Sequence, residues 1–182
     1  MRLKLALAAL MLPLTMPASA ALAPGAKAPN FTAKGAIAGR DFTVNLATQL
    51  KKGPVVLYFF PAAFTPGCSA EAAAFAAAVD DFKKAGAVVI GMSADPVDKL
   101  RDFSAKDCAG KFAVASASPD VIRGYDVALG RQIGGRDATN RTSYVIAPNG
   151  KIIYAHSDLS PADHVRNTLA AVRQGRSGKA DP

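Results

Sequence analysis

The sequence predicts a single α/β domain, a three-layer sandwich in which helices flank a central mixed sheet. Two patterns predict it. Continuous apolar runs, typical of strands buried on both faces, alternate with segments whose apolar residues recur at helical spacing. The chain then closes on two strands joined by a tight turn, so the alternating strands and helices are followed by a hairpin.

Residues 1–20 are predicted to be a secretory signal peptide. Arg2 and Lys4 precede an apolar stretch over residues 5–14, and the small residues 18–20 form a cleavage pattern. The apolar stretch is too short to span a bilayer. We therefore expect a protein without a membrane span that is periplasmic or otherwise exported.

The composition supports one soluble domain. The remaining chain has the length of a single domain with a full core, and 50% of all residues are hydrophobic. Loss of the two basic residues of the signal peptide lowers the formal net charge from +8 to +6. The other basic residues are scattered and do not interleave with aromatic residues, which argues against a nucleic-acid partner.

The domain is expected over residues 31–174, after an extended lead-in over 21–30 that does not belong to the core. A weakly alternating stretch that ends at residues 41–44 contains Gly35 and Gly39 around its turn. This stretch predicts a short hairpin at the start of the domain.

A buried strand and a long helix come next. The run over residues 55–60 is continuously apolar and stops at Pro61, so it predicts a strand buried on both faces. The alanine-rich segment 69–84 predicts a helix that ends near Gly86. Its apolar residues recur at helical spacing: Ala72, Phe75, Val79 and Phe82.

Two further strands and two helices are expected in the middle of the chain. Residues 87–92 and 112–117 have the composition of buried strands. Between them, Asp95 followed by Pro96 predicts a capped helix that runs to about residue 106. Residues 119–129 predict another short helix.

The chain ends with a hairpin and a helix. Strands are predicted over 142–147 and 151–155, because Pro148-Asn149-Gly150 between them is a strong turn signal. The last helix is expected to begin at Ser160, and residues 175–182 are expected to form a disordered tail. This order of elements fits a thioredoxin-like arrangement.

Cys68 is the residue with the clearest potential for chemistry. It lies between the buried strand and the alanine-rich helix, in the first helical turn, where free amides and the helix dipole favour a thiolate. Complete ionisation would raise the nucleophile concentration at pH 7 only about thirtyfold. A reactive cysteine here therefore needs donors that hold the substrate and stabilise charge on the leaving atom, such as the Thr65 hydroxyl and a nearby arginine.

The residues around Cys68 resemble those of a known family. Pro61, Thr65 and Cys68 match the P-x-x-x-T-x-x-C signature of peroxiredoxins, and residues 64–71 resemble the peroxiredoxin Q, or bacterioferritin comigratory protein, subfamily. The resemblance extends over about residues 28–174. The alternative is that Cys68 is a small buried apolar residue that follows an ordinary turn.

The resemblance implies roles for several residues. It implies a thiol-dependent peroxidase, an antioxidant enzyme that needs no metal, haem or flavin, in which Cys68 attacks the hydroperoxide. Arg141, at the start of a late strand, would lower the energy of the thiolate and hold peroxide. Thr65 would bind peroxide and Pro61 would shield the sulfur. Glu71 would orient Arg141, although a carboxylate in a first helical turn is equally explained by the dipole.

Cys108 has two interpretations. Many subfamily members carry a second cysteine five residues after the first, and Ala73 occupies that position here. Cys108 either resolves the oxidised Cys68 as an intramolecular disulfide, after local unwinding of the first helical turn, or it is a structural core cysteine of a one-cysteine enzyme. The implied reductant is an external thioredoxin-like dithiol protein. The subfamily resemblance implies a monomer.

Two other functions compete with this one. Cys68 with His156 or His164 would give a cysteine hydrolase, but neither histidine belongs to a recognisable motif. The chain could also be a redox-inactive thioredoxin-fold binding module with a static disulfide. The sequence leaves open the identity of the reductant, the preferred peroxide and the role of Cys108.

Overall fold

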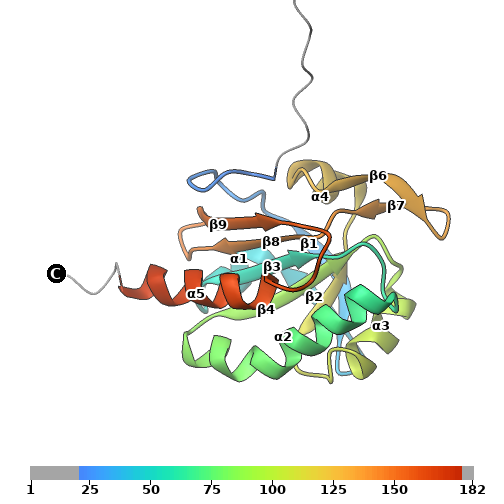
Figure 1. Ribbon diagram of the computed structural model, residues 1–182, viewed down its shortest axis with the longest axis horizontal. Helices are drawn as coiled ribbons and strands as arrows, with labels where there is room; N and C mark the ends of the chain where they lie inside the picture. The colour runs from blue at the N-terminus through green and yellow to red at the C-terminus, as the bar shows by residue number, and fades with distance from the viewer. Residues whose placement is uncertain (1–20, 178–182) are drawn as a thin grey trace, which may run out of the picture.

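A computed structural model of the chain describes residues 21–177 (Figure 1). The predicted signal peptide, residues 1–20, and the end of the predicted tail lie outside the described residues. Within residues 21–177 no helix is long and apolar enough to cross a membrane.

A mixed sheet forms the centre of the domain. Within the described residues it has seven strands in the order β2-β1-β5-β4-β3-β8-β9. The central pairs β3–β4 and β4–β5 are parallel, and the other neighbours are antiparallel. The strands are β1 Thr32–Ile37, β2 Arg40–Asn45, β3 Val55–Phe59, β4 Val88–Ser93, β5 Ala113–Ser116, β8 Thr142–Ile146 and β9 Ile152–Ser157.

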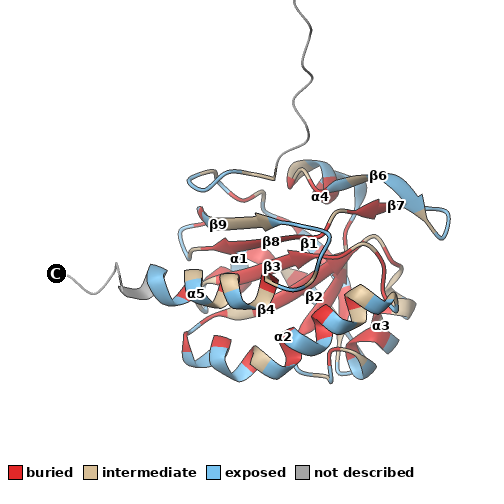
Figure 2. Cartoon of the chain, viewed as in Figure 1, coloured by how far each residue is buried: buried red, intermediate tan, exposed pale blue. Residues whose placement is uncertain are grey.

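Helices cover both faces of this sheet, as Figures 1 and 2 show. The helices are α1 Leu46–Leu50, α2 Pro66–Lys84, α3 Val97–Lys106, α4 Pro119–Gly124 and α5 His164–Ser177. Buried residues of α2, α3 and α5 share one apolar cluster, whereas those of α1 and α4 belong to a second cluster. The predicted three-layer, thioredoxin-like sandwich is therefore confirmed.

Strand β3 explains how the two clusters are separated. Every residue of β3 is buried, and alternate side chains enter opposite clusters because successive residues of a strand point to opposite faces. Leu57 and Phe59 belong to one cluster, and Val56 and Tyr58 belong to the other. The continuous apolar run in the sequence correctly predicted this central strand.

The lead-in is closer to the core than predicted. The amide of Gly25 donates to the carbonyl of Ile152 over 2.8 Å, and Lys27 forms a β-bridge with Lys151. Ala28 is buried within the core cluster that contains α1 and α4. The lead-in therefore covers part of the outer edge of β9, and the expectation that it lies outside the core is wrong.

The third helix begins differently from the prediction. Pro96, not Asp95, is its N-cap residue, and no side chain caps the helix. The carboxylate of Asp95 instead accepts from the amide of Ala63 over 2.6 Å and from the Ser93 hydroxyl over 2.9 Å, and Lys99 Nζ lies 2.7 Å away. The buried carboxylate thus has three donors elsewhere, which explains why it does not cap the helix.

The segment after α4 also differs from the prediction. The predicted helix over 119–129 ends at Gly124, and a separate hairpin follows, with β6 Ala128–Ile133 and β7 Arg136–Thr139. Gly134 and Gly135 connect the two strands with φ angles of 59° and 75°, which glycine adopts without strain.

The boundaries of the last helix are shifted. Helix α5 begins at His164 instead of Ser160, and it continues to Ser177, so the disordered tail cannot begin at residue 175. The amide of Ser160 donates to Oδ1 of Asp158 over 2.8 Å. This local turn delays the start of the helix by four residues, and the segment it creates adjoins the site described next.

Candidate active site

Cys68 lies where the sequence places it, in the first turn of α2. Thr65 is the N-cap residue and Pro66 occupies the first turn, where its missing N–H costs no helical hydrogen bond. The carbonyl of Thr65 accepts from the amide of Ser69 over 2.9 Å. The Cys68 side chain is buried, with 1% of its surface exposed.

Arg141 is the charged group that contacts the sulfur of Cys68. It immediately precedes β8, and the antiparallel pairing of Thr142 with Phe59 brings it beside the loop that leads from β3 to Cys68. Its Nη2 lies 3.5 Å from Cys68 Sγ. The structure therefore brings together the cysteine and the arginine that the sequence proposed, although they are 73 residues apart.

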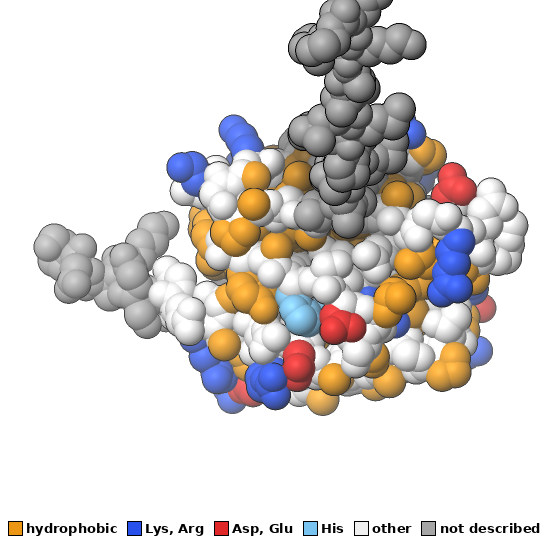
Figure 3. Space-filling model, turned by 45° about the horizontal axis from the view of Figure 1, so that its top comes forward, with side chains coloured by type: hydrophobic (Ala, Val, Ile, Leu, Met, Phe, Trp, Pro, Cys, Tyr) orange, Lys and Arg blue, Asp and Glu red, His pale blue; other side chains and the backbone are white. Residues whose placement is uncertain are grey.

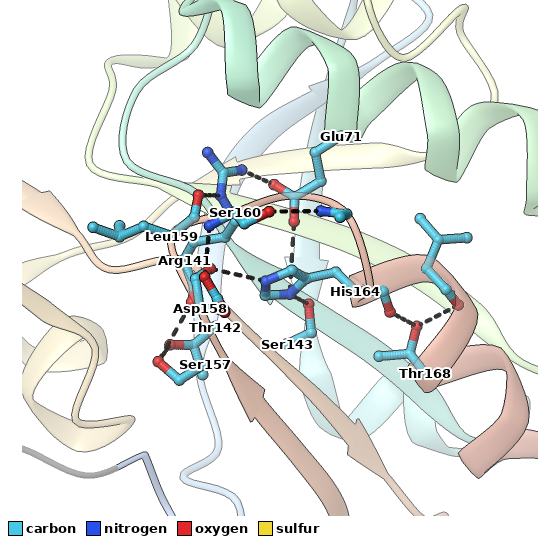
Figure 4. A network of polar contacts seen from close by, with 12 residues as sticks. Glu71, Arg141, Thr142, Ser143, Ser157, Asp158, Leu159, Ser160, His164 and Thr168 are labelled. Atoms are coloured by element: carbon cyan, nitrogen blue, oxygen red, sulfur yellow. Dashed lines mark hydrogen bonds and ion pairs between the residues drawn. The ribbon is translucent and has the colours of Figure 1, made fainter.

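Two further contacts hold the guanidinium. Nη1 of Arg141 contacts Oε2 of Glu71, and Nε donates to the carbonyl of Leu159 over 2.8 Å. The Arg141 side chain is only 5% exposed. Figure 4 shows the contacts of Arg141 with Glu71 and Leu159. Because Nη2 contacts Cys68 Sγ, all three guanidinium nitrogens have a partner.

Glu71 follows Cys68 by three residues, so both side chains lie on one face of α2. The Glu71 side chain is fully buried, and burial raises its pKa to about 7, although Arg141 acts to lower it. Its second oxygen, Oε1, has no hydrogen-bond partner among the described residues. Glu71 thus contacts Arg141 directly, as a role in orienting the arginine requires.

His164 lies behind this ion pair. Its Nδ1 is 3.8 Å from Oε1 of Glu71 and 2.8 Å from the Ser143 hydroxyl, and its Nε2 is 3.0 Å from the carbonyl of Asp158. Because a carbonyl only accepts, Nε2 carries the proton and Nδ1 accepts from Ser143 in the neutral ring. Burial lowers the pKa of His164 to about 4, which keeps the ring neutral at pH 7.

The contacts of His164 do not support the cysteine hydrolase hypothesis, which requires a histidine that acts on Cys68. Both ring nitrogens of His164 are engaged by groups other than Cys68. His156 contacts the His164 ring edge-on, with ring centroids 4.5 Å apart.

The sequence did not reveal the contact of His164 with the Glu71–Arg141 pair. These residues come from α5, α2 and the start of β8, and they carry no shared motif.

Thr65 and Pro61 lie in and beside the turn that precedes Cys68. The Thr65 hydroxyl donates to the carbonyl of Ala62 over 3.0 Å, which leaves its oxygen lone pairs for an incoming donor. Both Thr65 and Pro61 are half-buried. Phe64, between them, has a φ of 66° and is 42% exposed.

Cys108 follows α3 and is completely buried. Both cysteines are free thiols, and both belong to the apolar cluster formed by α2, α3 and α5. Burial, with a smaller contribution from Asp107, raises the pKa of Cys108 well above its ordinary value. The second cysteine is therefore held as a protonated, apolar side chain in this conformation.

Tyr58 belongs to the same apolar cluster as the two cysteines. The sequence did not indicate that its hydroxyl would be buried there. Its ring stacks on Phe75 with centroids 4.4 Å apart, and its hydroxyl has no hydrogen-bond partner among the described residues. Burial raises its pKa well above the ordinary value, and Cys108, Glu71 and Cys68 add to this. Within residues 21–177, no group of three or more His, Cys, Asp or Glu side chains could hold a metal ion.

Known proteins are similar to this chain in sequence and in fold. The chloroplastic peroxiredoxin Q of Oryza sativa subsp. japonica is 34% identical over 149 residues, 80% of this chain and 64% of the rice protein. The chain thus spans less than two thirds of that relative's length. Peroxiredoxin Bcp of Xanthomonas campestris pv. campestris is 31% identical over 121 residues, 65% of this chain and 76% of the relative.

A solved structure and a family model agree with these relatives. The crystal structure of peroxidoxin BcpB from Mycobacterium tuberculosis superposes with a TM-score of 0.73 at 29% identity, covering 83% of this chain and 96% of that one. The sequence model of the AhpC/TSA family matches residues 24–155, a span that contains Cys68 and Arg141. The chain therefore belongs to the AhpC/TSA family, with peroxiredoxins of the Q and Bcp type as relatives.

Proposed function

We propose that this protein is a thiol-dependent peroxidase that reduces hydrogen peroxide and organic hydroperoxides through Cys68. One observation carries the proposal: Arg141 Nη2 lies 3.5 Å from Cys68 Sγ at the start of a helix. A fixed cation beside a sulfur stabilises the thiolate, which is the nucleophilic form of cysteine. It also lies where charge develops on a leaving oxygen.

The first step follows from this arrangement. The Cys68 thiolate attacks the terminal oxygen of the hydroperoxide, so an S–O bond forms while the O–O bond breaks. The leaving oxygen takes a proton from solvent and departs as water or an alcohol, and Cys68 becomes a sulfenic acid. Arg141 holds the peroxide and the leaving oxygen, while the Thr65 hydroxyl accepts from the peroxide O–H.

Apolar residues in the segments around Cys68 are compatible with organic hydroperoxides as well as hydrogen peroxide. Pro61 and Phe64 belong to the turn before the cysteine, and Leu159 supplies the carbonyl that binds Arg141. The side chains of Phe64 and Leu159 are 42% and 52% exposed, whereas Cys68 is 1% exposed. Leu159 would contact the organic part of an alkyl hydroperoxide, and Pro61 would limit the access of water to the sulfur. The Phe64 ring packs edge-on against Phe103 of α3, with centroids 5.3 Å apart.

Cys108 is proposed to resolve the oxidised cysteine. It loses its proton and attacks the Cys68 sulfur; a disulfide forms and the hydroxyl of the sulfenic acid leaves as water. Both cysteines are buried free thiols, and local unwinding of the first turn of α2 is proposed to bring the sulfurs together. An external thioredoxin-like dithiol then reduces the bridge by thiol–disulfide exchange, which regenerates both thiols.

The site of action is part of the proposal. The signal-peptide pattern over residues 1–20 supports export to the periplasm, so the dithiol reductant would be an exported protein. Expression of the full chain in a Gram-negative host should give a periplasmic protein with the mass of a chain whose first residue is Ala21. An uncleaved protein that stays with the cytoplasmic fraction would contradict this.

The function is tested by the intact mass of the reduced protein before and after one equivalent of hydrogen peroxide. A product lighter by two hydrogens, with a peptide that joins Cys68 to Cys108, supports the two-cysteine cycle. A product heavier by oxygen at Cys68 keeps the peroxidase but assigns Cys108 a structural role. An unmodified Cys68 rejects the peroxidase and leaves a redox-inactive binding module.

Two single variants serve as controls. Cys108→Ser should accumulate the sulfenic acid at Cys68, because the proposed resolving thiol is missing. Cys68→Ser should remain unmodified at one equivalent, since burial keeps the Cys108 thiol protonated and unreactive. Oxidation of Cys108 in the second variant would argue that the two cysteines have been assigned in the wrong order.

A further inference from the structure

Arg141 is held in part by the loop between β9 and α5. The loop contacts the arginine through main-chain atoms. Nε of Arg141 donates to the carbonyl of Leu159, over 2.8 Å. Leu159 belongs to residues 158–163, which connect β9 to α5. Its side chain is 52% exposed, so its own packing contributes little to holding this carbonyl in place. Other contacts of the loop have to do so.

His164 supplies one of those contacts, as Figure 4 shows. Its Nε2 donates to the carbonyl of Asp158 over 3.0 Å, and Ser143 fixes the ring by donating to Nδ1 over 2.8 Å. The amide of Asp158 also donates to the carbonyl of Arg141 over 3.2 Å. The residue before Leu159 is therefore anchored both to the arginine and to the buried imidazole.

The same ring contacts the second partner of the arginine. Oε1 of Glu71 lies 3.8 Å from Nδ1 of His164, while Oε2 contacts Arg141. His164 is completely buried, so the ring fills the space behind the carboxylate. A neutral ring at this place restricts the rotation of Glu71 and does not compete with Arg141 as a cation.

We propose that His164 is a positioning residue for Arg141, which it holds through the Leu159 carbonyl and the Glu71 carboxylate. The inference rests on the peroxidase function proposed above, since it assigns His164 to the support of the group that faces Cys68. It differs from a role in packing alone because it requires the specific N–H that binds the carbonyl of Asp158. Displacement of a catalytic group by about 1 Å can cost about a hundredfold in rate.

Two amide substitutions separate these roles. In His164→Gln the side-chain amide can occupy the place of Nε2, so the donor to the Asp158 carbonyl is kept. In His164→Asn the shorter amide reaches only the place of Nδ1, so the Ser143 contact is kept and the Asp158 contact is lost. His156→Gln is the matched control, because it changes the neighbouring histidine on β9.

The two readouts are the hydrogen exchange of the Arg141 Nε–H, by nitrogen-15 NMR, and the rate constant for oxidation of Cys68 by hydrogen peroxide. Arg141→Lys assigns the Nε–H signal. We expect His164→Asn to accelerate the exchange at least tenfold and to slow oxidation about tenfold to a hundredfold. His164→Gln should stay within about threefold of the parent in both, and His156→Gln should match the parent.

Several results would overturn the inference. A folded His164→Asn protein with the parent's exchange and oxidation rates shows that the arginine does not depend on His164. Equal losses in the Gln and Asn variants show that only the packing of the ring matters. If His164→Asn does not fold, His164→Phe keeps a flat ring and removes the Nε2–H donor to the Asp158 carbonyl, and an unchanged Nε–H exchange in that variant likewise rejects the inference.

The exchange measurement also separates this inference from the proposed function. If peroxide leaves Cys68 of the parent unmodified, the peroxidase proposal fails. The Arg141 Nε–H comparison between the Asn and Gln variants still decides whether His164 positions the arginine.

Discussion

Arg141 makes its three contacts through the shape of the guanidinium as much as through its charge. One flat group reaches Cys68 Sγ, the Glu71 carboxylate and the Leu159 carbonyl in different directions. Lysine has the same charge but presents one compact ammonium group, which cannot meet three partners in this fixed geometry. The charge alone is therefore insufficient for the proposed chemistry.

Arg141→Lys should slow the oxidation of Cys68 by hydrogen peroxide about a hundredfold to a thousandfold, the usual effect of removing one donor that stabilises a developing anion. Stopped-flow measurement of the second-order rate constant provides the test. Arg136→Lys, on the exposed part of β7, is the control and should leave the rate unchanged. A folded Arg141→Lys protein that loses less than tenfold would remove Arg141 from the peroxide site.

The two buried titratable groups beside Arg141 respond to pH in opposite directions. Burial raises the pKa of Glu71 from 4.5 to about 7, so the stability that this residue contributes is present below pH 4.5 and is lost as the pH rises through 7. Burial lowers the pKa of His164 from 6.5 to about 4. Its contribution is present above pH 6.5 and is lost as the pH falls toward 4.

His164→Gln removes the titration of the histidine while Glu71 is kept in both proteins, so the stability difference between parent and variant reports mainly on His164. Between pH 7.5 and 4.5 the unfolded parent takes up a proton at residue 164 that the folded parent does not, which costs the parent about 2 kcal/mol relative to the variant. Urea unfolding at both pH values measures this change in the stability difference. A difference that is independent of pH would show that His164 titrates normally in the folded protein.

Gly91 of β4 pairs in register with Tyr58 of β3, and the Tyr58 side chain lies next to it. A Cβ atom at Gly91 would lie 2.8 Å from the Tyr58 hydroxyl and from the ring atom that carries it. The Tyr58 ring is in turn stacked on Phe75 of α2 and cannot retreat without moving that helix. Gly91 therefore leaves the space that the Tyr58 ring occupies between the sheet and α2.

Gly91→Ala should lower the free energy of unfolding by about 1–3 kcal/mol, as expected for an additional methyl group in a filled core. Chemical denaturation measures it. Gly124→Ala at the end of α4 is the matched control, since its Cβ would make ordinary contacts at 3.5 Å with Pro29. A Gly91→Ala protein as stable as the control would mean that the layer above the sheet is not closely packed.

The central elements could be predicted from the sequence, because burial leaves an apolar pattern. The fully buried strand β3 and the amphipathic α2 are examples. The hairpin of β6 and β7 was missed because most of its residues are exposed and leave no such pattern. The pair Gly134-Gly135 is a turn signal that could have indicated it.

The candidate site was predicted only in part, and for a related reason. Cys68, Thr65 and Pro61 are close in sequence, so one local motif reveals them. The resemblance also named Glu71 as a residue that orients Arg141, and the two are in contact. The contact of Glu71 with His164 was missed, because the two residues are far apart in sequence and burial of polar side chains leaves no periodic signal. For Asp95 the local sequence predicted a helix cap that is not observed. The amide of Ala63 and the Ser93 hydroxyl bind its carboxylate instead.

Copies of the protein could associate through the two edge strands of the sheet. Unpaired edge strands invite association unless they are charged or covered. At one edge β2 exposes Arg40, Asp41 and Thr43, and Asp41 is paired with Arg101. At the other edge β9 is partly covered by the lead-in through Gly25 and Lys27. Both edges are therefore protected against strand-to-strand pairing.

The described surface offers little apolar area for a stable oligomer. Among residues 21–177, the exposed large apolar residues are Phe64, Ile153 and Leu159. Phe64 belongs to the turn before Cys68, and the Leu159 carbonyl binds Arg141. Figure 3 shows apolar, basic and acidic side chains interspersed over one face of the molecule. Obligate interfaces bury about 2,000 Å² or more of mainly apolar surface.

We therefore predict that the protein without residues 1–20 is a monomer, both reduced and after oxidation by one equivalent of peroxide. Light scattering coupled to size exclusion should give the mass of one chain in both states and at increasing protein concentration. Phe64→Ser, which removes an exposed apolar side chain, should leave this mass unchanged. A reduced parent with twice the monomer mass, returned to one chain by Phe64→Ser, would instead identify the rim of the Cys68 site as an interface between copies.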